Sequence, residues 1–133
     1  MVDVEAGTFT YSSAGHPPPL VCGASGVAFL DGGLGVPLDA AGPAEREEAE
    51  VALAPGDLLV LYTDGLIERR GESIADGLDR LAGVAGCAAG RSPAEVADAL
   101  LRELLDPDGR DDVAVLVHAV RPAAGVLRGA SAR

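Results

Sequence analysis

Two unbroken apolar runs predict the main strands of this chain. The first, Leu58–Leu61, has no polar position, which is typical of a strand covered on both faces. The second, Val113–Val117, has the length of a strand and a bias toward β-branched residues. Before the first run, Pro55-Gly56 predicts a type II turn, because Pro presets φ and Gly accepts the positive φ that follows.

Shorter patterns predict further strands. Residues 8–13 alternate and are rich in strand-forming side chains, which places Phe9 and Tyr11 on one face. Two short apolar runs, 20–22 and 27–30, flank the tetrapeptide GASG, and this arrangement predicts a hairpin.

The stretch between the hairpin and the first long strand leaves alternatives open. Residues 31–42 carry four glycines and one proline, so we expect a loop. It is either a loop near a site, with Gly35 permitting close backbone approach, or a plain connector. Residues 46–53 have the composition of a helix, but Pro55 shortly afterwards and the hairpin spacing favour a strand.

Beyond residue 68 the pattern becomes helical. Ile74, Leu78 and Leu81 share one face of a first helix, which we expect to end at Gly83 and Gly86. The apolar face is expected to pack on the sheet.

A second helix is predicted by the capping box Ser92-Pro93-Ala94-Glu95 and runs to about Leu105. Its apolar stripe contains Val96, Leu100 and Leu104, widened by Ala97, Leu101 and Leu105. Together the patterns predict an α+β fold in which two helices pack on one face of a mainly antiparallel sheet.

Composition sets the class of molecule. The 133 residues suffice for one domain with a single core built from Val, Leu and Ala, because only 3% are aromatic. A net charge of −11 argues against nucleic acids and anionic membranes as partners. No apolar run approaches the roughly 18 residues of a membrane span, and no signal peptide is recognisable, so we expect a cytoplasmic protein. Cys22 and Cys87 are expected to be buried free thiols.

Acidic residues stand at the ends of both long strands. Asp64-Gly65 follows the first, and Asp111-Asp112 precedes the second. If the two strands are antiparallel neighbours, these carboxylates converge on one rim of the sheet. Convergent carboxylates need a cation between them, and hard oxygen ligands favour magnesium, manganese or calcium over zinc. The alternatives are that Asp64 only opens a turn or caps a helix, and that the acidic pair is a solvated turn.

His16 precedes three prolines that hold the chain extended. It is either a ligand or proton donor, or a loop residue whose ring binds backbone. Neither Ser nor Cys lies beside a His as a nucleophile would, so a reaction built on these residues would use metal-activated water.

Taken in order, YSSAGHPPPLV, LGV, YTDGLIE and GRDDVAVLV resemble the PPM (2C-like) family of metal-dependent serine/threonine protein phosphatases. Within that family, the motifs look like those of the bacterial stage II sporulation protein E branch. The resemblance runs from about Thr8 to Val117. It implies a layered α/β/β/α sandwich, of which this chain forms roughly half.

The resemblance also implies a site. Asp64 and Asp111 occupy the positions of family metal ligands, and Gly65 and Asp112 are candidates to bind or support the metal, with Asp112 standing where relatives often carry Asn. Two Mg²⁺ or Mn²⁺ ions are expected in a complete domain. The implied substrate is a phosphoprotein, such as a phosphorylated anti-sigma-factor antagonist in a partner-switching pathway.

One departure from the family is large. Its members carry further acidic motifs upstream of AGHPPP, whereas only seven residues precede the matching region here. We therefore expect residues 1–120 to be the C-terminal portion of a phosphatase domain, inactive in isolation, and residues 121–133 to be a disordered tail. The alternative is a non-catalytic remnant or interaction module. We also expect one face of the sheet to be left uncovered, and an exposed apolar face favours self-association with a second copy or with the missing half.

Overall fold

The structure is a computed structural model that describes residues 1–3, 6–38, 46–109 and 111–122. Its strands form two antiparallel sheets and one short parallel pair. The four-stranded sheet has the order β5 (Gly26–Phe29), β4 (Leu20–Gly23), β8 (Leu58–Tyr62), β9 (Val115–Ala119). The three-stranded sheet has the order β1 (Val2–Asp3), β2 (Thr8–Tyr11), β7 (Ala49–Ala52). The parallel pair is β3 (Ser13–Ala14) with β6 (Leu34–Gly35).

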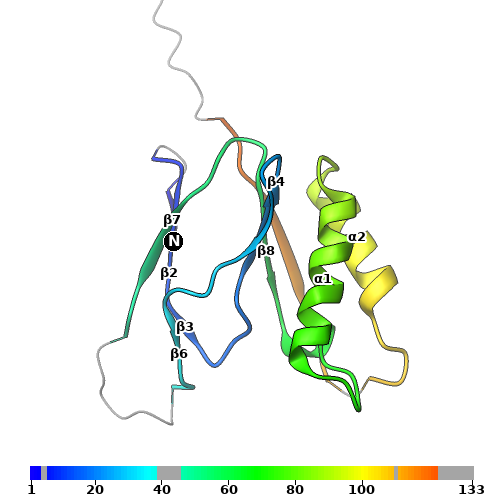
Figure 1. Cartoon of the computed structure of the whole chain (residues 1–133). Helices are drawn as coiled ribbons and strands as arrows, with labels where there is room; N and C mark the ends of the chain where they lie inside the picture. Colours follow the sequence, from blue (N-terminus) through cyan, green and yellow to red (C-terminus); the bar gives the residue numbers. More distant parts are fainter. Residues whose placement is uncertain (4–5, 39–45, 110, 123–133) are drawn as a thin grey trace, which may run out of the picture.

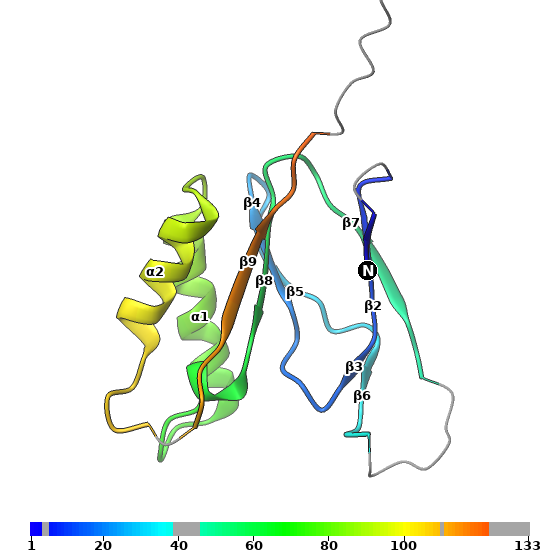
Figure 2. The same ribbon diagram turned by 180° about the vertical axis from the view of Figure 1, so that it is seen from behind.

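The elements stack in three layers (Figures 1 and 2). Helices α1 (Ile74–Ala88) and α2 (Pro93–Leu104) cover one face of the four-stranded sheet, and the three-stranded sheet lies across its other face. The expected α+β fold with two helices on one sheet face is therefore confirmed. The expectation of an uncovered sheet face was wrong for the four-stranded sheet, because β2 and β7 pack over it.

Strand β8 explains the layers, because it sends side chains to both sides. Leu58 and Val60 enter the core beneath the helices, whereas Leu59 enters a smaller core beneath the three-stranded sheet. This two-sided burial is what the unbroken apolar run predicted. The helix-side core also contains Leu20, Cys22, Tyr62, Leu66, Ile67, Leu81, Ala85, Ala88, Val96, Ala99, Leu100 and Leu104. The sheet-side core also contains Phe9, Leu30 and Leu53. The single core expected from composition is thus divided in two.

Several local predictions are confirmed. Gly56 has a φ of 94°, and Asp57 N–H donates to Ala54 O at 3.0 Å, as a type II turn requires. The hairpin forms from β4 and β5, and the disputed stretch before Leu53 is strand β7, not a helix. The rings of Phe9 and Tyr11 stack with centroids 5.1 Å apart.

Helix α1 departs from the prediction at both ends. It passes through Gly83 and Gly86 to Ala88, so the expectation that these glycines end it was wrong. Each glycine costs the helix about 1 kcal/mol relative to alanine, and burial of Leu81, Ala85 and Ala88 offsets that cost. At its start, Ile74 is 57% exposed and does not belong to the core face.

Helix α2 begins as predicted, with Ser92 and Glu95 in a reciprocal capping box. Its stripe is narrower than expected, because Leu101 and Leu105 are 36% and 50% exposed. Both cysteines are free, but only Cys22 is buried, so the prediction was wrong for the exposed Cys87.

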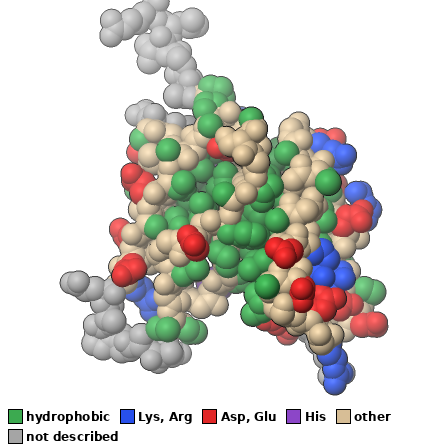
Figure 3. All heavy atoms as spheres, in the orientation of Figure 1, with side chains coloured by type: hydrophobic (Ala, Val, Ile, Leu, Met, Phe, Trp, Pro, Cys, Tyr) green, Lys and Arg blue, Asp and Glu red, His purple; other side chains and the backbone are tan. Residues whose placement is uncertain are grey.

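Other apolar side chains remain at the surface. Leu116 on β9 is 55% exposed, and Figure 3 shows hydrophobic side chains gathered between the two sheets on the face in view. Among the described residues, no helix is both long and apolar enough to cross a bilayer. The predicted tail from residue 121 lies mostly outside the described residues, as does the end of the 31–42 loop.

Candidate metal centre

Strands β8 and β9 are antiparallel neighbours, as the predicted convergence of the carboxylates required. Thr63, which follows β8, extends their pairing through its backbone N–H, which donates to Ala114 O at 3.1 Å. Its hydroxyl donates to Asp112 O and accepts from Ala114 N–H, each at 3.0 Å. One threonine therefore joins the two acidic segments. Sequence reasoning missed it, although a hydroxyl residue directly before Asp-Gly was the available signal.

The same hydroxyl explains why β9 begins later than predicted. The apolar run was expected to form a strand from Val113, but β9 starts at Val115. The Thr63 hydroxyl hydrogen-bonds to the Asp112 carbonyl and to the Ala114 N–H, so these two groups are not available to pair with the backbone of a neighbouring strand.

Asp64 opens a 3₁₀ turn, Asp64–Leu66, at the end of β8. Its carbonyl accepts from Ile67 N–H at 2.8 Å and from Glu68 N–H at 2.9 Å, and its Oδ1 accepts from Gly65 N–H at 2.9 Å. Leu66 and Ile67 are buried, while the Asp64 side chain is exposed. Asp64 thus does open a turn, as the simpler interpretation held, yet the turn keeps its carboxylate at the surface of the rim.

Gly65 brings the two acidic segments into contact. A Cβ at this position would lie 2.8 Å from Asp112 O and 3.2 Å from Asp111 Cβ, so only glycine fits without displacing the facing backbone. Asp111 and Asp112 are both exposed. Gly65 and Asp111 also line an open cavity of about 860 Å³, together with Glu68, Arg69, Arg70, Glu72, Ser73, Ile74, Asp106, Asp108 and Gly109.

The donor chemistry of this rim suits a hard cation. Carboxylate oxygens are the ligands that Mg²⁺ and Mn²⁺ prefer, and the close packing at Gly65 holds the two carboxylate-bearing segments together. The set is small, however. Within the described ranges, no cluster of three or more His, Cys, Asp or Glu side chains could hold a metal. The residues fit a divalent metal in kind and supply part of its coordination, so the roles of Asp64 and Asp111 as ligands stay predictions.

The two predicted loop residues, His16 and Gly35, lie near one another at the β3–β6 pair. Gly35 in β6 pairs with Ala14 in β3, directly before the turn at Gly15, and Gly15 N–H donates to Gly35 O at 2.9 Å. His16 follows this turn with an exposed side chain, and its carbonyl accepts from Ser13 Oγ at 3.5 Å. In the described part of the chain, no hydrogen bond joins His16 or Gly35 to Asp64.

A buried tyrosine ties the His16 loop to the end of β8. Tyr62 Oη donates to Pro18 O at 2.8 Å. Burial raises the pKa of Tyr62 far above its ordinary value of 10.0, so the phenol stays protonated and keeps this bond at working pH. The AGHPPP segment is therefore fixed to the strand that carries the Asp64 turn.

The model of the family described as Stage II sporulation protein E (SpoIIE) matches residues 1–121. The chain belongs to the SpoIIE family. The resemblance read from the ordered motifs is thereby confirmed.

Solved structures agree with membership of the SpoIIE family. The RsbU and RsbW domains of Rv1364c from Mycobacterium tuberculosis match with a TM-score of 0.78 and 32% identity, over 91% of this chain and 35% of that chain. The phosphatase domain of SpoIIE from Bacillus subtilis matches with a TM-score of 0.71 and 18% identity, over 92% of this chain and 54% of that one. The SiaA PP2C domain of Pseudomonas aeruginosa matches with a TM-score of 0.62 and 23% identity, over 86% of this chain and 47% of that one. The last two show the fold alone.

This SpoIIE-family chain spans about half or less of each of these solved chains. Two further similar structures contain or were exposed to metals: a SpoIIE phosphatase domain presoaked with Mn, and RsbX in complex with magnesium.

Proposed function

We propose that this chain forms part of a metal-dependent serine/threonine phosphoprotein phosphatase, in which Asp64 and Asp111 bind Mg²⁺ or Mn²⁺. The observation that carries the proposal is the contact at Gly65, which packs the Asp64 turn against Asp111 and Asp112. Membership of the SpoIIE family supports the same reaction class. The remaining ligands are proposed to come from outside the described residues of this chain, in keeping with its share of the similar structures.

Each residue of the rim has a separate task in this proposal. Asp64 and Asp111 present carboxylate oxygens, Thr63 fixes the distance between their segments, and Gly65 lets the segments touch. When bound, the metal would supply activated water and stabilise charge on the phosphate oxygens. Asp112 is proposed to bind or support the metal beside Asp111.

The proposed substrate is a phosphorylated protein of a bacterial partner-switching pathway, such as an anti-sigma-factor antagonist. Support comes from the similarity to RsbU and SpoIIE domains. The net charge of −11 gives an electrostatic preference for cations over polyanions, which suits a metal site and argues against nucleic acid as the substrate.

A chimera tests the function directly. Residues 1–122 would replace the similar segment of the M. tuberculosis RsbU domain, and hydrolysis of a phosphoserine peptide would be followed with Mn²⁺. Asp64→Asn and Asp111→Asn should each lower kcat/KM by about a hundredfold or more, since a metal contributes several kcal/mol and each tenfold is about 1.4 kcal/mol. Asp98→Asn, at an exposed position within α2, is the matched control and should leave kcat/KM unchanged.

The outcomes separate the proposal from the alternative of a non-catalytic module. That alternative has one observation in its favour, the small donor set of the described residues. A folded chimera without turnover would support the module. If the chimera is active and Asp64→Asn leaves its kcat/KM unchanged, the proposed metal site is excluded.

A further inference from the structure

The far end of the Asp64 turn is held by helix α1. Ile67 N–H donates to Asp64 O at 2.8 Å, and Ile67 O accepts from Arg80 Nη2 at 3.3 Å. Gly77 of α1 lies against the same carbonyl, because a Cβ there would be 2.2 Å from Ile67 O. Two hydrogen bonds through one residue therefore connect Arg80 with the backbone of Asp64.

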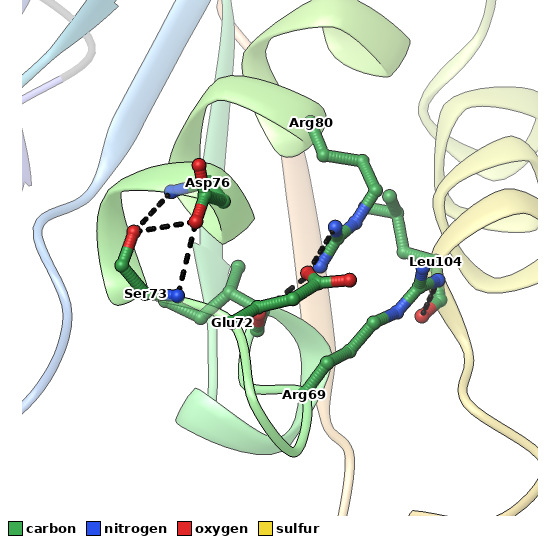
Figure 4. Close-up of polar contacts among 7 residues, drawn as sticks. Arg69, Glu72, Ser73, Asp76, Arg80 and Leu104 are labelled. Carbon is green, nitrogen blue, oxygen red and sulfur yellow. Dashed lines mark hydrogen bonds and ion pairs between the residues drawn. The ribbon is translucent and has the colours of Figure 1, made fainter.

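The guanidinium of Arg80 is itself fixed in place. Its Nη1 lies 2.6 Å from Glu72 Oε2, and the two side chains are 24% and 37% exposed (Figure 4). Glu72 precedes α1, so Arg80 bridges the turn and the segment that leads into the helix. A forked guanidinium can reach two acceptors in this way, which a lysine does less well.

Arg80 also has one buried polar atom whose hydrogen-bonding capacity is not used. Its Nε is buried and has no hydrogen-bond partner within the described residues. A buried N–H without an acceptor destabilises a fold, and an apolar side chain of similar size would avoid this loss. The position thus keeps an arginine, with its contacts to Ile67 and Glu72, in spite of this loss.

Arg69 makes a parallel connection to the other helix. Its Nη2 donates to Leu104 O at 3.4 Å, at the C-terminal end of α2, where a cation is favoured by the helix dipole (Figure 4). Its Nε is likewise buried without a partner among the described residues. The segment after Asp64 is thus attached to both helices through arginines.

From these contacts we infer that Arg80 is a positioning residue for Asp64. By holding Ile67 O, it keeps the 3₁₀ turn closed and the Asp64 carboxylate at the rim beside Asp111. The inference rests on the proposed function only where it assigns the metal to Asp64. The closure of the turn can be measured without metal.

Amide hydrogen exchange measures that closure in the 133-residue chain. Arg80→Met keeps most of the side-chain volume and removes both polar contacts. It should speed exchange of the Ile67 and Glu68 amides, which donate to Asp64 O, at least tenfold relative to the Val60 amide in β8. Arg80→Lys should restore part of the protection, because lysine retains a donor.

Metal binding supplies the second measurement. Mn²⁺ should broaden the amide signals of Gly65 and its neighbours, and Arg80→Met should raise the Mn²⁺ concentration for half-broadening at least fivefold. Arg102→Met is the control, since Arg102 forms an exposed ion pair with Glu103 on α2. If the methionine variant does not fold, Glu72→Gln, which leaves the bond to Ile67 in place, should give a smaller change in the same direction.

A purely structural role for Arg80 predicts a different result. Arg80→Met would then lower the free energy of unfolding but would not change the exchange rates of the Ile67 and Glu68 amides relative to Val60, nor the Mn²⁺ concentration for half-broadening. That result would overturn the inference. Absence of Mn²⁺ broadening in the unmodified chain would count against the proposed function instead. The exchange rates of the Ile67 and Glu68 amides relative to Val60 would still show whether Arg80 holds the Asp64 turn closed.

Discussion

The contact between α1 and the Asp64 turn can be tested with one methyl group. Gly77→Ala would place a Cβ 2.2 Å from Ile67 O and 2.9 Å from Ile67 C, both backbone atoms that cannot rotate away. The helix and the turn would have to separate by roughly 1 Å to reach an ordinary contact. Gly83 provides the matched control in the same helix, because a Cβ there meets nothing within 4 Å.

The magnitude follows from three contributions. Overpacking costs about 1–3 kcal/mol. Separation also breaks the bond from Arg80 to Ile67 O, already 3.3 Å long, at a cost of about 1 kcal/mol. Alanine gains about 1 kcal/mol of helix propensity over glycine. We therefore expect Gly77→Ala to destabilise the fold by about 1–3 kcal/mol and Gly83→Ala to stabilise it by up to about 1 kcal/mol.

Urea unfolding followed by circular dichroism measures both changes, and thermal unfolding provides a check at roughly 3–5 °C per kcal/mol for a chain of this size. The Gly77 variant should also show the fast exchange at Ile67 that is expected of Arg80→Met. Equal stabilisation by both alanines would refute the close contact, and with it the support of the turn by α1.

Three further predictions concern association, metal affinity and pH. The chain should self-associate through its exposed apolar surface, so light scattering after size exclusion should show more than a monomer, and Leu116→Asp should reduce both association and hydrophobic-dye binding; a monomer that binds no dye would contradict this. Calorimetry should show Mn²⁺ or Mg²⁺ binding no tighter than roughly millimolar. Hydrolysis of p-nitrophenyl phosphate should be no faster than for Asp64→Asn, and micromolar affinity would show that the chain holds a full site alone. The bonds from Ser73 hold the pKa of Asp76 below its ordinary value of 3.8, so this carboxylate stabilises the fold above that pH and loses its effect as the pH falls through the lowered pKa. Ser73→Ala should therefore lower the free energy of unfolding at neutral pH, with a deficit that shrinks in acid; a deficit that does not change with pH would rule out the coupling.

The parts of this fold that follow from short-range pattern could be predicted from sequence. An apolar run without polar interruption indicated two-sided burial of β8, and the capping box at Ser92 indicated where α2 begins. The antiparallel pairing of β8 and β9 then placed Asp64 near Asp111, because the end of one strand meets the start of the other.

What the sequence left open depends on contacts between distant segments. Nothing local shows that β2 and β7 pack over Leu59, so the covered second face was not predicted. The passage of α1 through Gly83 depends on burial of its neighbours on the sheet, which outweighs propensity. Arg80 looks like any helix-surface cation in the sequence, and its bond to Ile67 exists only once the helix is docked. The metal roles of Asp64 and Asp111 remain predictions that the chimera will test.

The pairing of β8 with β9 has a consequence for synthesis of the chain. Leu59 pairs with His118, so roughly 60 residues must follow before the partner strand is made, a wait of roughly 3–12 s at about 5–20 residues/s. During this interval β8 can pair with the earlier β4, but its other edge stays open to foreign strands. The nascent protein therefore passes through a stage in which the Asp64 turn can form while Asp111 has not yet been translated, and the rim is completed only by the last strand.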